Sequence, residues 1–199
     1  MTLGWSGGGP HALACAALLP HRCRAAATIA GVAPYDAAGL DWLAGMGEEN
    51  IAEFAAAAAG AGELTAYLER EARGLAAVRA SDVAAALGDL VSDVDKRALT
   101  GEFAEYLAAS FRAALSAGIA GWRDDDLAFL TDWGFGLDRF SVPVAIWQGD
   151  EDRMVPFDHG RWLATHIPGA ATHLQPGEGH LSLLTRGLDT ILANLTRAT

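Results

Sequence analysis

The chain has 199 residues and a formal net charge of −11; 51% of its residues are apolar and 20% are charged. This composition favours a soluble globular domain over a disordered chain. Phosphate groups are bound mainly by lysine and arginine, so the excess of acid argues against nucleic acid and anionic membranes as partners. No apolar run is long enough to span a bilayer.

The cysteines and the N-terminal residues point to a cytoplasmic protein. The residues after Met1 lack the basic start and the apolar segment of an export signal. Cys15 and Cys23 do not form a Cys-x-x-Cys pair, so we interpret them as reduced thiols rather than a disulfide or a metal site. No metal-ligand pattern or cofactor motif is found elsewhere.

The first predicted element is a turn between a strand and a helix. Gly4-Trp5-Ser6-Gly7-Gly8 fits the pattern G-x-S-x-G, in which a strained turn exposes a serine. The following segment "HALACAALL" (11–19) predicts a helix whose alanines allow close packing. In a glycine-rich chain the pattern alone is weak, and a plain glycine-rich loop remains an alternative at this point.

A second strand and a long helical segment come next. "AAATIAGV" (25–32) is a short apolar run typical of a buried parallel strand. Residues 36–130 then carry 17 acidic and 7 basic residues and contain no convincing strand. Within them Phe103, Leu107, Phe111, Leu115 and Ile119 recur every four residues, which predicts one helix that begins after Thr100 and ends before Gly121. The charge and helicity of this segment indicate a separate structural part.

Two more strands complete the predicted sheet. "VPVAIWQG" (142–149) leads into "GDEDRMVP", and "ATHLQ" (171–175) leads into "PGEGHLSLL". Both loops therefore lie past the carboxyl ends of strands, on the sheet edge that also holds Ser6, where ligands of open parallel sheets bind. A serine hydroxyl needs a base, and the base needs an acid to orient it. The chain supplies Ser, Asp and His in that order.

These motifs together resemble the α/β-hydrolase superfamily, in particular cap-bearing esterases and proline-iminopeptidase-like hydrolases. The resemblance implies an α/β fold with a mostly parallel sheet, a core of residues 1–35 and 131–199, and a helical cap at 36–130. It implies Ser6 as nucleophile, His180 as base, Asp152 as acid and the Gly7 N–H as an oxyanion donor. Asp150 and Glu151 compete with Asp152, which alone stands three residues after Gly149 and three before Val155-Pro156.

At its N-terminal end this chain departs from the family pattern. Such enzymes place several strands and a second oxyanion donor before the serine turn. The chain is therefore expected to correspond to the C-terminal portion of a hydrolase, with an exposed sheet edge through which it could oligomerise.

We expect a serine hydrolase that cleaves a small ester, amide or related acyl compound. A transferase of the same fold is a variant of this hypothesis. The alternative is an impaired or inactive fragment, or a non-catalytic binding module.

Overall fold

Four parallel strands form the centre of the protein in the computed structural model, which describes residues 1–198. The sheet order follows the chain: β1 (Thr2–Trp5), β2 (Ala26–Ile29), β3 (Val144–Gly149) and β4 (Ala171–Gln175). In the register, Gly4 pairs with Thr28, Thr28 with Ile146, and Ile146 with Thr172. The expected α/β fold with a mostly parallel sheet is confirmed.

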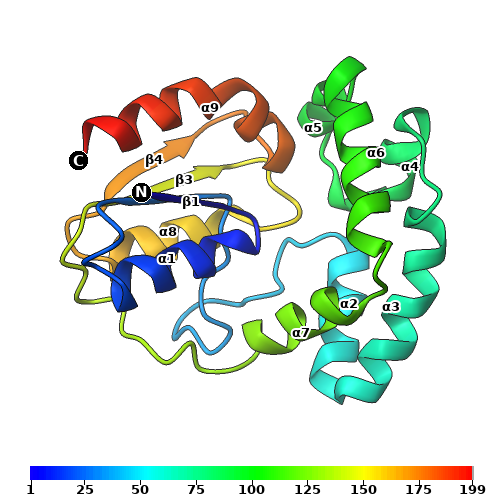
Figure 1. Ribbon diagram of the computed structural model, residues 1–199, viewed down its shortest axis with the longest axis horizontal. Coiled ribbons are helices and arrows are strands. Elements are labelled where there is room, and N and C mark those ends of the chain that lie inside the picture. The colour runs from blue at the N-terminus through cyan, green and yellow to red at the C-terminus, as the bar shows by residue number, and fades with distance from the viewer. Residues whose placement is uncertain (199) are drawn as a thin grey trace.

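Three helices cover the two faces of the sheet (Figure 1). Helices α1 (Gly8–Leu18) and α8 (Phe157–His166) lie on one face, and α9 (His180–Arg197) lies on the other. Neighbouring residues of a strand point to opposite faces. Accordingly Ile146 packs with Leu13 of α1, whereas Trp147 packs with Ile29 and with Ile191 of α9.

The second strand is shorter than the apolar run that predicted it. The run covers 25–32, but β2 ends at Ile29 because Ala30 adopts a left-handed conformation with φ of 50°. A residue with a Cβ rarely takes this conformation, and it turns the chain out of the sheet. The segment that follows leads towards the helices between β2 and β3.

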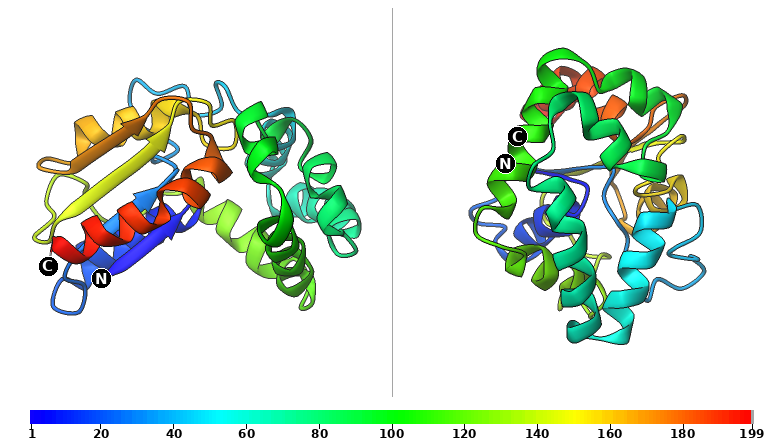
Figure 2. Two further views of the ribbon diagram at one scale, coloured as in Figure 1. Left: turned by 90° about the horizontal axis from the view of Figure 1, so that it is seen from above. Right: turned by 90° about the vertical axis from the view of Figure 1, so that its right-hand side faces the viewer.

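Residues 48–129, here called the helical insertion, contain the helices between β2 and β3. They lie beyond the carboxyl ends of the strands (Figures 1 and 2). The helices are α2 (Glu48–Ala59), α3 (Ala61–Leu75), α4 (Val83–Ala86), α5 (Asp93–Ala98), α6 (Gly101–Leu115) and α7 (Ala120–Phe129), with short 3₁₀ turns at Ala80–Asp82 and Gly88–Leu90.

The prediction of one helix from Thr100 to Gly121 was wrong at its C-terminal end. Helix α6 ends at Leu115, and Gly118 then turns the chain with φ of 88°. Ile119 stands at the start of α7, and Gly121 lies inside that helix. The apolar spacing of four residues thus continues across the break between the two helices. It does not require one continuous helix, since both helices belong to the same insertion.

His159 joins α8 to the loop after β2. Its ring is fully buried, with 0% of the residue exposed. The Ala33 N–H donates to Nδ1 at 3.1 Å, so the neutral ring donates its Nε2 proton to the carbonyl oxygen of Trp42, 2.9 Å away. Burial lowers the pKa of His159. The ring is therefore built into the core in its neutral form.

The buried His159 should make the fold less stable in acid. The unfolded chain takes up a proton on this residue below about pH 6.5, whereas the folded protein resists doing so. The free energy of unfolding should therefore fall as the pH drops from 8 to 5. The full loss amounts to about 1.4 kcal/mol for each unit by which folding lowers the pKa of His159. Urea unfolding at several pH values measures this.

His159→Gln tests the origin of that loss. Glutamine offers one acceptor and a donor amide without a titrating group. The variant should lose less stability between pH 8 and pH 5 than the parent protein. His166→Gln, which removes an exposed imidazole from the same helix, is the control and should keep the parent slope. Equal slopes in parent and His159→Gln would contradict the assignment.

Candidate active site

Ser6 lies at the turn between β1 and α1 and has an unusual backbone conformation. Its φ is 56°, in the left-handed region that a residue with a side chain rarely adopts. The turn is tight because Gly4 lies directly against the start of α1. A Cβ on Gly4 would stand 2.0 Å from the carbonyl oxygen of Gly8. The first glycine of the G-x-S-x-G pattern thus has a steric cause in this chain, whereas a Cβ on the second, Gly8, would meet nothing within 4 Å.

Gly7 follows Ser6 at the N-cap position of α1. Its N–H belongs to the first N–H groups of a helix, which have no acceptor within the helix. The ring of Phe129, at the end of α7, covers this position closely. A Cβ on Gly7 would lie 2.8 Å from that ring. The helical insertion therefore reaches the serine turn.

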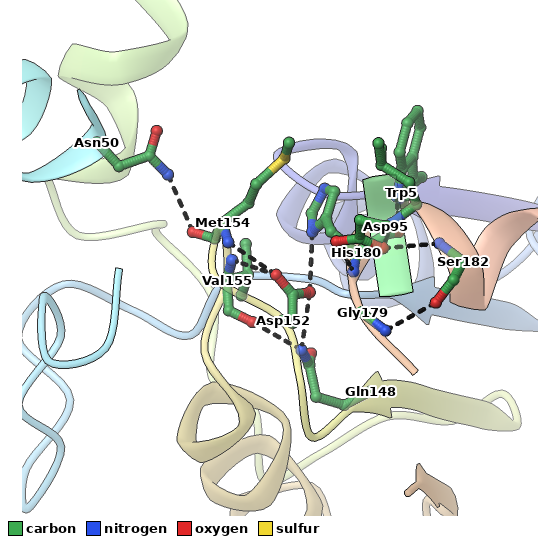
Figure 3. Close-up of polar contacts among 11 residues, drawn as sticks. Trp5, Asn50, Asp95, Gln148, Asp152, Met154, Val155, Gly179, His180 and Ser182 are labelled. Carbon is green, nitrogen blue, oxygen red and sulfur yellow. Dashed lines mark hydrogen bonds and ion pairs between the residues drawn. The ribbon is translucent and has the colours of Figure 1, made fainter. Parts of the chain in front are cut away.

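The carboxylate of Asp152 is fully enclosed in the loop after β3 (Figure 3). Its Oδ1 accepts the backbone N–H groups of Met154 and Val155 at 2.9 and 2.8 Å. Its Oδ2 accepts from Nε2 of Gln148 at 3.2 Å and from Nδ1 of His180 at 2.9 Å. Each carboxylate oxygen therefore has two donors.

His180 is the first residue of α9, and its side chain is 1% exposed. Because Nδ1 donates to Asp152, a neutral ring has its lone pair at Nε2. The indole of Trp5, the residue before Ser6, lies beside this ring with centroids 5.3 Å apart. The Trp5 indole N–H also donates to the carbonyl oxygen of His180 at 3.2 Å. These contacts place His180 next to the serine turn.

Two of the three candidate catalytic side chains are directly bonded. Within residues 1–198, Asp152 and His180 form a pair, but no hydrogen bond joins the Ser6 hydroxyl to His180. The competing acids lie elsewhere. Asp150 is exposed and accepts the Gly177 N–H at 2.7 Å, and Glu151 is exposed.

A cavity of about 1000 Å³ extends from Ser6 into the helical insertion. The described lining contains Ser6 but neither Asp152 nor His180. Apolar side chains from several helices form much of its wall: Leu75, Val78, Leu87, Leu90, Phe111 and Leu115. The cavity is large enough for a small organic molecule.

The same cavity is negatively charged. Five acidic residues and no lysine or arginine occur among its described lining residues: Glu49, Glu53, Glu71, Asp82 and Asp125. Burial first, and then the charges of Glu53 and Glu71, raise the pKa of Tyr67 to about 12. The hydroxyl of Tyr67 thus lies in a field that opposes a further negative charge.

One carboxyl group in this region is buried against another. Asp126 is 4% exposed, and burial together with the charge of Glu53 raises the pKa of Asp126 to about 9. The Trp122 indole N–H donates to Glu53 at 2.7 Å. At neutral pH Asp126 therefore holds a proton beside Glu53, whose own pKa is also raised by burial.

Sequence reasoning missed several of these residues. Gln148 lies within the predicted strand and next to the acid loop, so its position was a usable signal. Asp95, which bonds the backbone of His180, lies 85 residues away in α5 and gives no local signal. The pairing of Glu53 with Asp126 likewise depends on how α2 and α7 pack. Only the folded chain shows these contacts.

Clusters of metal-binding side chains and membrane-spanning helices are both absent from the part of the chain that the structure describes. Among residues 1–198, no group of three or more His, Cys, Asp or Glu side chains is placed to hold a metal ion. In the same residues no helix is both long enough and apolar enough to cross a bilayer. Cys15 and Cys23 are free thiols.

Solved structures of hydrolases share this fold. Similar structures include the esterase RhEst1 from Rhodococcus sp. ECU1013 (18% identity, TM-score 0.56, 99% of this chain and 65% of that chain). A meta-cleavage product hydrolase from Pseudomonas fluorescens IP01 is 15% identical (TM-score 0.59, 98% and 63%). An alpha/beta hydrolase fold protein from Nakamurella multipartita is 23% identical (TM-score 0.56, 98% and 68%). The chain thus spans about two thirds of these relatives.

Comparison with curated proteins gives no match. A family model described as "alpha/beta hydrolase fold" matches residues 1–187, which is nearly the whole chain. The parallel sheet and its flanking helices agree with this match. The chain belongs to the alpha/beta hydrolase fold family.

Proposed function

We propose that this protein is a serine hydrolase that cleaves an ester, amide or related acyl compound through an acyl-Ser6 intermediate. The observation that carries the proposal is the buried bond between Asp152 and Nδ1 of His180, beside the turn that holds Ser6. A histidine oriented in this way has its other nitrogen free to take a proton. Membership of a hydrolase family and the cavity next to Ser6 support the same proposal.

The reaction uses these groups in two halves. As the Ser6 oxygen attacks the acyl carbon, Nε2 of His180 takes the serine proton and then gives it to the leaving group. Water enters, loses a proton to the same nitrogen and releases the acid, while the serine regains its proton. An alcohol or thiol in place of water makes the same step an acyl transfer. Asp152 holds the ring and stabilises its positive charge throughout.

The start of α1 supplies the electrostatic part of the mechanism. The attacked carbonyl oxygen becomes negative, and the Gly7 N–H is the proposed donor to it. The positive end of the α1 dipole acts in the same direction. The left-handed conformation of Ser6 is consistent with a turn of this kind, which exposes the serine side chain.

The acyl substrate is proposed to occupy the cavity between Ser6 and the helical insertion. Its apolar wall suits an apolar acyl or alcohol group. The acidic side chains around it disfavour a substrate that is itself an anion.

The nucleophile is tested by covalent labelling. A fluorophosphonate probe should label the protein, and Ser6→Ala should abolish labelling, because only a serine with an adjacent base is reactive near neutral pH. Ser116→Ala, at an exposed serine after α6, is the matched control and should label as the parent does. Hydrolysis of p-nitrophenyl esters, measured in parallel, should depend on Ser6 in the same way. Undiminished labelling of Ser6→Ala would contradict the proposal, and an unlabelled parent would favour the non-catalytic alternative.

The acid is tested by two matched substitutions. Asp152→Asn should lower the labelling rate by about 10³-fold or more, because an amide stabilises the wrong tautomer of the histidine. Asp150→Asn removes the same charge two residues away and keeps an acceptor for the Gly177 N–H, so it should label at the parent rate. A larger loss in Asp150→Asn than in Asp152→Asn would reverse the assignment.

The charge of the cavity is tested by a pair of substrates of equal size. A neutral p-nitrophenyl ester should be hydrolysed several-fold faster than its analogue with a carboxylate at the end of the acyl chain. Added salt should narrow this difference, because it screens the carboxylates of the cavity. Equal rates for the two esters at low salt would show that the field of the cavity does not reach Ser6.

A further inference from the structure

Asp95 of α5 is a buried carboxylate that bonds the start of α9. The residue is 0% exposed. Its Oδ2 accepts the backbone N–H of His180 at 3.0 Å, and its Oδ1 accepts those of Leu181 and Ser182, each at 2.9 Å (Figure 3 shows this carboxylate beside His180). These are three of the N–H groups that a helix leaves without an internal acceptor. A side chain of the helical insertion therefore caps the helix that begins with the proposed base.

The loop before α9 is shaped to admit this carboxylate. A Cβ on Gly179 would stand 2.5 Å from both oxygens of Asp95, so a side chain at this position would force the carboxylate to move. The Gly179 N–H does not bond Asp95 but donates to Oγ of Ser182 at 2.8 Å. The glycine at this position therefore leaves the space that Asp95 fills.

We propose that Asp95 is a positioning residue for His180 and that it couples the helical insertion to the catalytic base. The proposal rests on the proposed function, since it concerns the same histidine. The ring of His180 is held by Asp152 at one end, and its backbone is held by Asp95 at the other. Both anchors are carboxylates, but they come from the loop after β3 and from α5.

The chemistry of the contact explains why it is strong. Hydrogen bonds to an ionised acceptor are about twice as strong as neutral ones, and a negative charge at the start of a helix is favoured by the dipole. A buried carboxylate that lost these donors would be strongly destabilised. Helix α5 and the first turn of α9 are therefore expected to move as one unit, so that a displaced insertion also displaces His180.

The test compares Asp95→Ala and Asp95→Asn with the parent protein. The control is Asp93→Asn, on the same helix, where the carboxylate is 86% exposed and pairs with Lys96. Saturation kinetics of fluorophosphonate labelling separate the maximal rate of Ser6 modification from the affinity for the probe. The rate of amide hydrogen exchange at residues 180–182 reports whether the hydrogen bonds from these N–H groups to residue 95 are kept. Urea unfolding reports the global stability of each variant.

Asp95→Ala should lower the maximal labelling rate about 10- to 100-fold, because small misplacements of a catalytic group have effects of this size. The affinity for the probe should not change, since Asp95 does not line the cavity. Asp95→Asn retains one acceptor oxygen, the one that can serve Leu181 and Ser182, and should lie between the parent and Asp95→Ala. Amide exchange at residues 180–182 should be fastest in Asp95→Ala, slower in Asp95→Asn and slowest in the parent. Asp93→Asn should match the parent.

Gly179→Ala provides a second route if Asp95→Ala fails to fold. The added methyl group should push the carboxylate away and reproduce the loss of labelling while Asp95 itself is kept. Where Asp95→Ala does fold, the double variant Asp95→Ala/Gly179→Ala has free space at this position, so the second change should add little to the first. Additive effects of the two changes would overturn the proposed contact.

The outcomes separate this proposal from the proposed function. If the parent labels at Ser6 and Asp95→Ala labels at the same maximal rate, the positioning role is wrong although the hydrolase stands. If the parent does not label, the hydrolase is wrong, and exchange at 180–182 still decides whether Asp95 holds α9. Unchanged exchange in Asp95→Ala would overturn the contact in either case. A loss of labelling explained by global unfolding alone would also count against it.

Discussion

The parallel direction of the four strands is the constraint on which the candidate site depends. Because β1, β3 and β4 all run the same way, the turns that follow them open at one edge of the sheet. Ser6, Asp152 and His180 each follow a strand within a few residues and so all lie at this edge. The helical insertion leaves from the same edge after β2, which places it over these turns (Figures 1 and 2).

The segment between β2 and β3 carries most of the net negative charge, whereas the sheet and its flanking helices carry little. Residues 36–130 hold nearly all of the net negative charge of the chain. Part of that charge faces the cavity, part is neutralised by a proton between Glu53 and Asp126, and part is used at Asp95 to bond backbone N–H groups. Acidic residues that look alike in the sequence thus have three different physical roles. Burial and the available donors distinguish them.

Much of the fold was predictable because its signals are local. Short apolar runs gave the strands, and the glycines around Ser6 gave the turn. The resemblance to the α/β-hydrolase pattern, in which the acid lies between a glycine such as Gly149 and a Val-Pro pair, favoured Asp152 over Asp150, and Asp152 is the carboxylate that is hydrogen-bonded to His180. The break between α6 and α7 was not predicted, because the apolar period runs on through Gly118. The contact of Asp95 with His180 joins residues 85 positions apart, and no local pattern records it.

The strained backbone conformation of the serine turn falls on a residue that has a side chain. Glycine occupies positions 4, 7, 8 and 9, yet the left-handed conformation falls on Ser6, which has a Cβ. A residue with a Cβ in this conformation stores strain of about 1 kcal/mol or more. Under the proposed function, this strain accompanies the exposure of the Ser6 hydroxyl at the tip of the turn.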